Sequence, residues 1–173
     1  MSRMLFAVAI AAVAATAAQA HVSLEAGEAP AGSAYKAVLR VPHGCEGEAT
    51  LKVRVQIPEG VIAVKPMPKP GWTIETVKGK YAHPYDYFGS QVTEGVTEIA
   101  WSGALPDDYY DEFAFRATLT EALGVGSEVY FPVVQECAGK TERWIEIPAA
   151  GQDPETLEYP APGVKLLPAA GGN

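Results

Sequence analysis

The amino-acid sequence predicts an all-β protein that folds as a single-domain antiparallel β-sandwich. Short runs alternate apolar and polar residues at a period of 2, the pattern of half-buried strands. Gly- and Pro-rich turns separate the runs, and no long stretch shows the period of 3.6 that an amphipathic helix requires. A chain of 173 residues also suits one domain with one hydrophobic core.

Three of the predicted strands carry the clearest pattern. In residues 35–41, 51–57 and 112–119 the apolar side chains occupy alternate positions, so each strand has one buried and one solvent-facing side. Residues 65–71 contain three prolines, which lack the amide donor that a regular strand needs. Residues 79–95 are polar and aromatic, and we expect a long loop there. The other predicted strands are residues 22–27, 61–64, 72–77, 97–102, 128–135 and 143–147.

The first 20 residues are typical of a secretory signal peptide. Arg3 supplies the positive charge, an uncharged apolar run follows, and Ala18 and Ala20 form an A-x-A cleavage site. The apolar run is shorter than the roughly 20 residues of a membrane-spanning helix. We therefore expect cleavage between Ala20 and His21, and a periplasmic or secreted protein whose mature chain has no transmembrane segment.

The expected domains are the signal peptide over residues 1–20, the β-sandwich over residues 21–148, and a loose Pro-, Ala- and Gly-rich tail over residues 149–173. The formal net charge is −8 and becomes −9 when the single leader charge, Arg3, is removed. No basic patch is present, which argues against nucleic acid and anionic membranes as partners. We expect a monomer or a weak dimer.

The two cysteines, Cys45 and Cys137, are most simply paired in one disulfide, because exported proteins mature in an oxidising compartment. A thiolate metal pair is the alternative. The sequence has no C-x-x-C spacing to support that alternative.

Cleavage after Ala20 would give the mature protein an N-terminal histidine with a chemistry that internal histidines lack. The free α-amine and the ring Nδ1 of His21 can close a six-membered chelate ring on one metal ion. Both nitrogens must be deprotonated to bind, so affinity should fall at acid pH. Two such nitrogens suit tetragonal Cu(II), and a carboxylate oxygen would suit a further ligand. A histidine at this position by chance is the alternative.

Several stretches carry a resemblance to a known family. They are His21-Val22, residues 64–72 with Pro70-Gly71-Trp72, Asp111-Glu112-Phe113, residues 131–135, and Arg143-Trp144. In this order, across nearly all of the mature chain, they resemble the YcnI family of exported copper-binding domains.

The resemblance implies an immunoglobulin- or cupredoxin-like sandwich with a Cu(II) site called a monohistidine brace. By this resemblance, His21 supplies the amine and ring nitrogens, Glu112 supplies oxygen, and Trp144 lies beside the metal. The pattern places Glu112 on the strand face opposite Phe113. It assigns Ile145 and Ile147 to the core, so that Trp144 points away from the core. From the residues alone, the favoured interpretation of Glu112 is a solvated strand residue paired with Arg116, and that of Trp144 is ordinary packing against the adjacent sheet edge or tail.

Two other histidines are candidate ligands. His43, in a loop, has the pattern of a surface residue, and His83 lies among tyrosines. A second histidine near His21 would resemble the histidine brace of copper monooxygenases. The acidic turn over residues 107–111 lacks the spacing of an EF-hand calcium loop.

The sequence thus predicts a periplasmic Cu(II)-binding protein for copper handling, as chaperone, buffer or delivery factor, with no catalytic residues. Its expected partners are the copper ion and other periplasmic copper-handling proteins. The alternatives are a copper-dependent oxidative enzyme and a metal-independent β-sandwich interaction module.

Overall fold

The computed structural model describes residues 21–169, so the expected leader over residues 1–20 lies outside the described part. In the described part the chain forms strands and two short 3-10 turns, and it contains no helix long and apolar enough to cross a membrane. The strands are β1 (Ser23–Leu24), β2 (Glu28–Pro30), β3 (Ala34–Val41), β4 (Thr50–Gln56), β5 (Val61–Pro66), β6 (Thr73–Tyr87), β7 (Ser90–Leu105), β8 (Asp111–Leu119), β9 (Glu128–Tyr130), β10 (Val133–Cys137), β11 (Thr141–Trp144) and β12 (Gly163–Leu167); the turns are η1 (Glu121–Leu123) and η2 (Pro154–Thr156).

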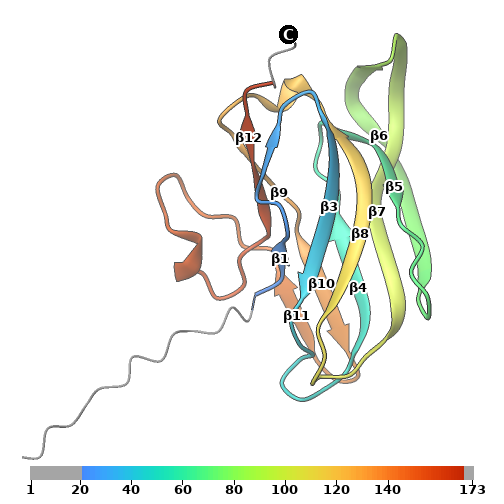
Figure 1. The fold of residues 1–173 in the computed structure, drawn as a ribbon, viewed down its shortest axis with the longest axis vertical. Helices are drawn as coiled ribbons and strands as arrows, with labels where there is room; N and C mark the ends of the chain where they lie inside the picture. The colour runs from blue at the N-terminus through green and yellow to red at the C-terminus, as the bar shows by residue number, and fades with distance from the viewer. Residues whose placement is uncertain (1–20, 170–173) are drawn as a thin grey trace, which may run out of the picture.

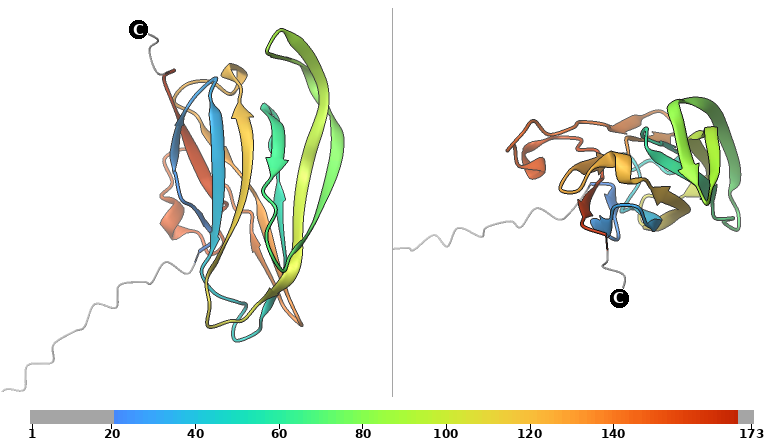
Figure 2. Two further views of the ribbon diagram at one scale, coloured as in Figure 1. Left: turned by 45° about the vertical axis from the view of Figure 1, so that its right-hand side comes forward. Right: turned by 90° about the horizontal axis from the view of Figure 1, so that it is seen from above.

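The strands form three sheets that enclose one core (Figures 1 and 2). A four-stranded sheet has the order β1-β3-β8-β5, and a five-stranded sheet has the order β11-β10-β4-β7-β6. A three-stranded sheet, β2-β12-β9, lies along one edge of the sandwich. Every pairing is antiparallel except that of β2 with β12, so the predicted antiparallel β-sandwich is confirmed for the described chain.

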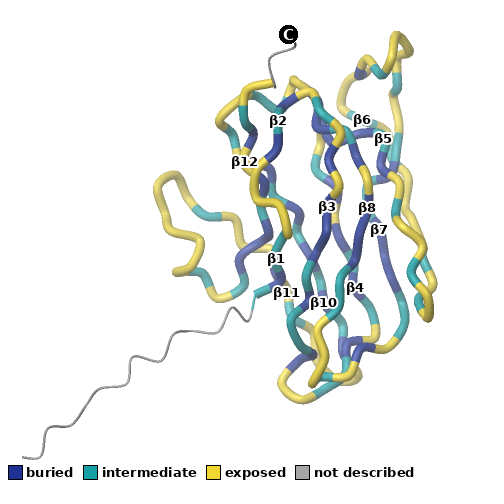
Figure 3. The backbone as a smooth tube through the Cα atoms, in the orientation of Figure 1, coloured by how far each residue is buried: buried dark blue, intermediate teal, exposed yellow. Residues whose placement is uncertain are grey.

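The core lies between the two larger sheets, where the alternating strands place their apolar residues. Figure 3 shows the buried positions along the inner strands and the exposed ones at the hairpin and loops. Leu39 and Phe113 pair across β3 and β8 and are fully buried, and Val53 and Trp101 do the same across β4 and β7. The period-2 pattern of these strands therefore identifies the buried side of each sheet.

The predicted loop over residues 79–95 is wrong, because this region is a long β6–β7 hairpin that projects beyond the sandwich (Figure 1). Its turn is Phe88-Gly89, with φ of 51° and 78°, the pair of positive φ values of a type I′ turn. The ladder shifts register between Lys80 and Tyr85, and Pro84 lies in this irregularity, where its missing amide donor is tolerated.

The predicted strand over residues 128–135 is two strands that belong to different sheets. β9 pairs with β12 in the three-stranded sheet, whereas β10 pairs with β4 and β11 in the five-stranded sheet. Pro132 stands between them, and the chain changes sheets there because proline cannot donate to a ladder.

The loose tail expected over residues 149–173 needs correction. β12 pairs with both β2 and β9, and its Val164 and Leu166 are fully buried in the core. The sandwich therefore extends at least to Leu167. Alternating apolar residues in a five-residue strand do not stand out against the Pro- and Gly-rich sequence around them.

Candidate metal centre

His21 lies at the entry to β1, and the fold holds its position through the residues that follow it. Val22 is buried in the core, and Ser23 and Leu24 pair with Arg40 and Leu39 of β3. Because β1 and β3 are antiparallel, the ladder leads His21 toward the end of β3 and the loop that begins there. The first residue of the expected mature chain is thus anchored to the sandwich.

The ring of His21 contacts the ring of Trp144. The two rings lie 5.5 Å apart between centroids with planes tilted by 55°, and Tyr159 packs on Trp144 at 5.2 Å. Trp144 is 3% exposed, whereas Ile145 is 37% exposed. The prediction that Trp144 points away from the core is therefore wrong: it faces the core beside His21, and Ile145 faces outward.

A buried glutamine holds the indole of Trp144. Gln135 accepts a hydrogen bond from Trp144 Nε1 at 3.1 Å, and its Nε2 donates to the His43 carbonyl and to Thr50 Oγ1, both at 2.7 Å. Gln135 is fully buried, so these bonds satisfy an amide that would otherwise be costly to bury. Sequence reasoning missed this residue, although it occupies the core-facing side of β10 between Val133 and Cys137.

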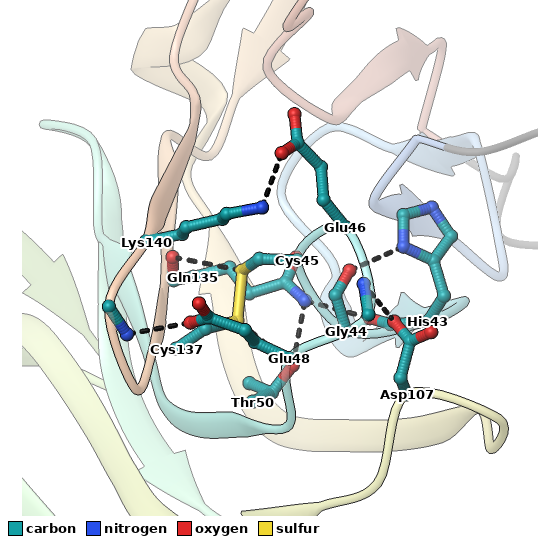
Figure 4. Close-up of a disulfide and its surroundings, with 12 residues drawn as sticks. His43, Gly44, Cys45, Glu46, Glu48, Thr50, Asp107, Gln135, Cys137 and Lys140 are labelled. Atoms are coloured by element: carbon teal, nitrogen blue, oxygen red, sulfur yellow. Dashed lines mark hydrogen bonds and ion pairs between the residues drawn. A yellow bond between two sulfur atoms is a disulfide. The ribbon is translucent and has the colours of Figure 1, made fainter.

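The Cys45–Cys137 disulfide forms and encloses 92 residues, as predicted (Figure 4). It joins the loop between β3 and β4 to the end of β10, two residues beyond Gln135. Around it, Glu48 accepts a hydrogen bond from the Gly139 amide at 2.6 Å, and Lys140 pairs with Glu46. The disulfide therefore fixes the loop that carries His43 against the strands that lead to Trp144.

Glu112 is separated from β1, the strand that follows His21, by Arg40. Ser23, Arg40 and Glu112 form one row across β1, β3 and β8, with Arg40 in the middle. Arg40 Nε lies 3.6 Å from Glu112 Oε1, and Tyr110 Oη donates to the same oxygen at 3.3 Å. The predicted outward orientation of Glu112 is confirmed by its 40% exposed side chain, with Arg40 rather than Arg116 as its partner.

Glu142 is a carboxylate near Trp144 that sequence reasoning did not select. It precedes Trp144 by two residues on β11 and pairs with the buried Gln135, so it shares their face of the sheet. Its Oε2 is buried and has no hydrogen-bond partner among residues 21–169. Burial raises the pKa of the Glu142 carboxyl; nearby His43 opposes this shift, and Glu46 adds to it.

On another side His21 lines a pocket of about 200 Å³ between β1 and the segment before β12. Glu128, Tyr130 and Glu155 line the same pocket. Burial raises the pKa of the Tyr130 hydroxyl, and the charge of the neighbouring Glu128 raises it further. Glu128 itself is exposed to solvent.

The described residues contain no group of three or more His, Cys, Asp or Glu side chains placed to hold a metal ion. A monohistidine brace needs only one histidine and one carboxylate, because the α-amine supplies a ligand. His83 is remote from His21, since β6 and β11 form opposite edges of the five-stranded sheet. The arrangement of His21, Trp144 and a nearby carboxylate fits a brace in its residue types.

Comparisons with known proteins identify a family and a similar solved structure. The family described as "Domain of unknown function (DUF1775)" matches residues 21–166. An uncharacterized protein from Nocardia farcinica, whose crystal structure is reported to reveal an immunoglobulin-like fold, is 26% identical, with a TM-score of 0.61. The alignment covers 85% of this chain and 98% of that one. A search of curated proteins gives no match.

Proposed function

This chain belongs to the DUF1775 family, which contains YcnI-like proteins, and we propose that it is a YcnI-like exported Cu(II)-binding protein that serves copper handling. The observation that carries the proposal is the packing of His21 against Trp144 at 5.5 Å. Cleavage after Ala20 would release an amine at the residue that the fold already holds beside a buried tryptophan.

His21 would supply two nitrogens to the metal, and a carboxylate would supply oxygen. These nitrogen and oxygen donors suit tetragonal Cu(II), which stands at the top of the affinity order of the divalent metals. Trp144 would cover one side of the metal and exclude water from it. The disulfide supports an oxidising compartment, and hence an exported protein in which Cu(II) is the expected form.

The uncleaved precursor is expected to be a poorer copper ligand, because the His21 nitrogen is then an amide, which must lose a proton before it can bind a metal ion. Processing would thus couple copper binding to export. This coupling fits a buffer, chaperone or delivery factor that acts only outside the cytoplasm.

The experiment is a Cu(II) titration of protein exported with its own leader and shown by mass spectrometry to begin at His21. We expect binding of one Cu(II) per chain. His21→Ala, which still begins with a free α-amine, should weaken binding at least 100-fold, since it removes the ring nitrogen of the chelate. His83→Ala is the matched control and should bind as the parent does. Equal affinity of the parent and His21→Ala would refute the proposal.

Two other results would favour the alternative functions. Copper-dependent turnover with a reductant and an oxidant would support an oxidative enzyme. Capture of a partner with unchanged affinity after metal removal would support an interaction module.

A further inference from the structure

Glu142 has a buried oxygen without a hydrogen-bond partner, on the strand that carries Trp144. Two buried side-chain polar atoms in residues 21–169 have no hydrogen-bond partner, Trp101 Nε1 and Glu142 Oε2. Of these, only the Glu142 oxygen is a metal ligand type. We propose that Glu142, rather than Glu112, supplies the carboxylate oxygen to Cu(II), an inference that rests on the proposed function.

β11 places Glu142 on the same face as Trp144, the residue that His21 contacts. Glu142 and Trp144 are neighbours on one face of this strand, about 7 Å apart along it. The Trp144 ring contacts both His21 and Tyr159. The pKa of the Tyr159 hydroxyl is raised, first by Glu158 and by burial, with a further contribution from Glu142. His21, Trp144, Tyr159 and Glu142 thus gather at one end of the sandwich.

The loop after β3 closes the same end. His43 acts electrostatically on Glu142, and its carbonyl accepts the hydrogen bond from Gln135, which pairs with Glu142 across β10 and β11. The register of β1 with β3 leads His21 toward this loop. Glu142 therefore lies on the strand that carries Trp144, close to the loop that His21 approaches.

The position of Glu112 argues against it as the donor. Neighbouring strands lie about 4.8 Å apart, so β8 is roughly 10 Å from β1. Arg40 occupies the row between them and pairs with Glu112. A metal cation held between His21 and Glu112 would lie close to the Arg40 guanidinium and would have to displace this ion pair.

The state of the Glu142 carboxylate favours a cation. A carboxylate oxygen withdrawn from water without a donor is destabilising, and a bound metal ion would satisfy it. Gln135 holds the adjacent indole by a hydrogen bond, so the wall beside this oxygen is rigid. Glu128 differs, because it is exposed to solvent at the start of β9.

The test compares Glu142→Gln with the matched variant Glu112→Gln, both exported and processed to begin at His21. We expect Glu142→Gln to weaken Cu(II) binding at least 10-fold and to change the copper hyperfine coupling in electron paramagnetic resonance. Glu112→Gln should leave both unchanged. Glu142→Asp, which shortens the side chain, should fall between the parent and Glu142→Gln. Circular dichroism should show that every variant is folded.

Parent-like binding and spectra in Glu142→Gln would overturn the inference, whichever way Glu112→Gln behaves. Loss of binding in Glu128→Gln with retention in Glu142→Gln would overturn it in favour of the pocket on the other side of His21. A processed parent that binds no Cu(II) would instead refute the proposed function itself. The parent titration therefore separates the two failures.

Discussion

Removal of the Cys45–Cys137 disulfide should destabilise this protein strongly. The bond closes a loop of 92 residues. For this loop the chain-entropy relation gives about 15.6 cal/mol/K of lost entropy in the unfolded chain, or about 4.6 kcal/mol at 25 °C. Since total stabilities are about 5–15 kcal/mol, this is a large share. At about 2–4 °C per kcal/mol, the melting temperature of Cys45→Ala/Cys137→Ala should fall by about 9–18 °C.

The assay is equilibrium unfolding in urea, followed by the fluorescence of the buried tryptophans, for the parent, the double variant and the parent under reductant. The double variant and the reduced parent should lose similar free energies of unfolding. The comparison separates loss of the cross-link from loss of the buried sulfur atoms. A loss below about 1 kcal/mol in both samples would refute the reasoning, because the unfolded chain would then gain little freedom from opening this loop.

Three further predictions concern the stability of the sandwich. Gln135→Leu should cost about 2–4 kcal/mol in urea unfolding, because it leaves the buried Trp144 Nε1 without its acceptor; a cost below 1 kcal/mol would contradict this. Burial, and secondarily Glu25, raises the pKa of Tyr35 to about 12. The contribution of the neutral Tyr35 hydroxyl to the free energy of unfolding is therefore complete below about pH 10 and is lost as the pH rises toward 12. Tyr35→Phe should therefore have a lower melting temperature than the parent at pH 7, and its melting temperature should fall less between about pH 10 and 12. An equal fall of the melting temperature in both proteins over this pH range would argue against this. Arg116 lies between Lys36 and Lys65 in one row of the four-stranded sheet, so Arg116→Glu should raise the melting temperature, and Arg116→Ala by less; a decrease in both would contradict the like-charge argument.

The fold class follows from the sequence because alternation reports directly which side of a strand is buried. β3, β4 and β8 are long, regular strands, and their patterns predict their faces correctly. The β6–β7 hairpin was missed because most of its side chains are exposed, so no apolar alternation marks it. β12 was missed because its stability comes from pairing with β2 and β9, which are remote in sequence.

The candidate site was only partly predictable, because it too depends on pairing between strands that are remote in sequence. Cleavage chemistry singles out His21, and the resemblance singles out Trp144; the structure brings these two residues together. The apolar pattern of a strand does not show which other strands it pairs with. The position of Arg40 between Glu112 and β1 therefore could not be predicted from the sequence. Glu142 could have been selected because it lies two residues before Trp144 and so shares its strand face. This signal could not be used from the sequence, because only the structure shows that Trp144 is buried.

The central claim is that Cu(II) binds the α-amine that processing creates at His21. The most direct measurement is electron paramagnetic resonance of the copper-loaded, processed protein, with histidine labelled by ¹⁵N only at the α-nitrogen. His43 and His83 carry this nitrogen as an amide, so the label reports the mature N-terminus alone. We predict coupling to two nitrogens, of which one changes with the label. A spectrum that the label leaves unchanged would contradict the account.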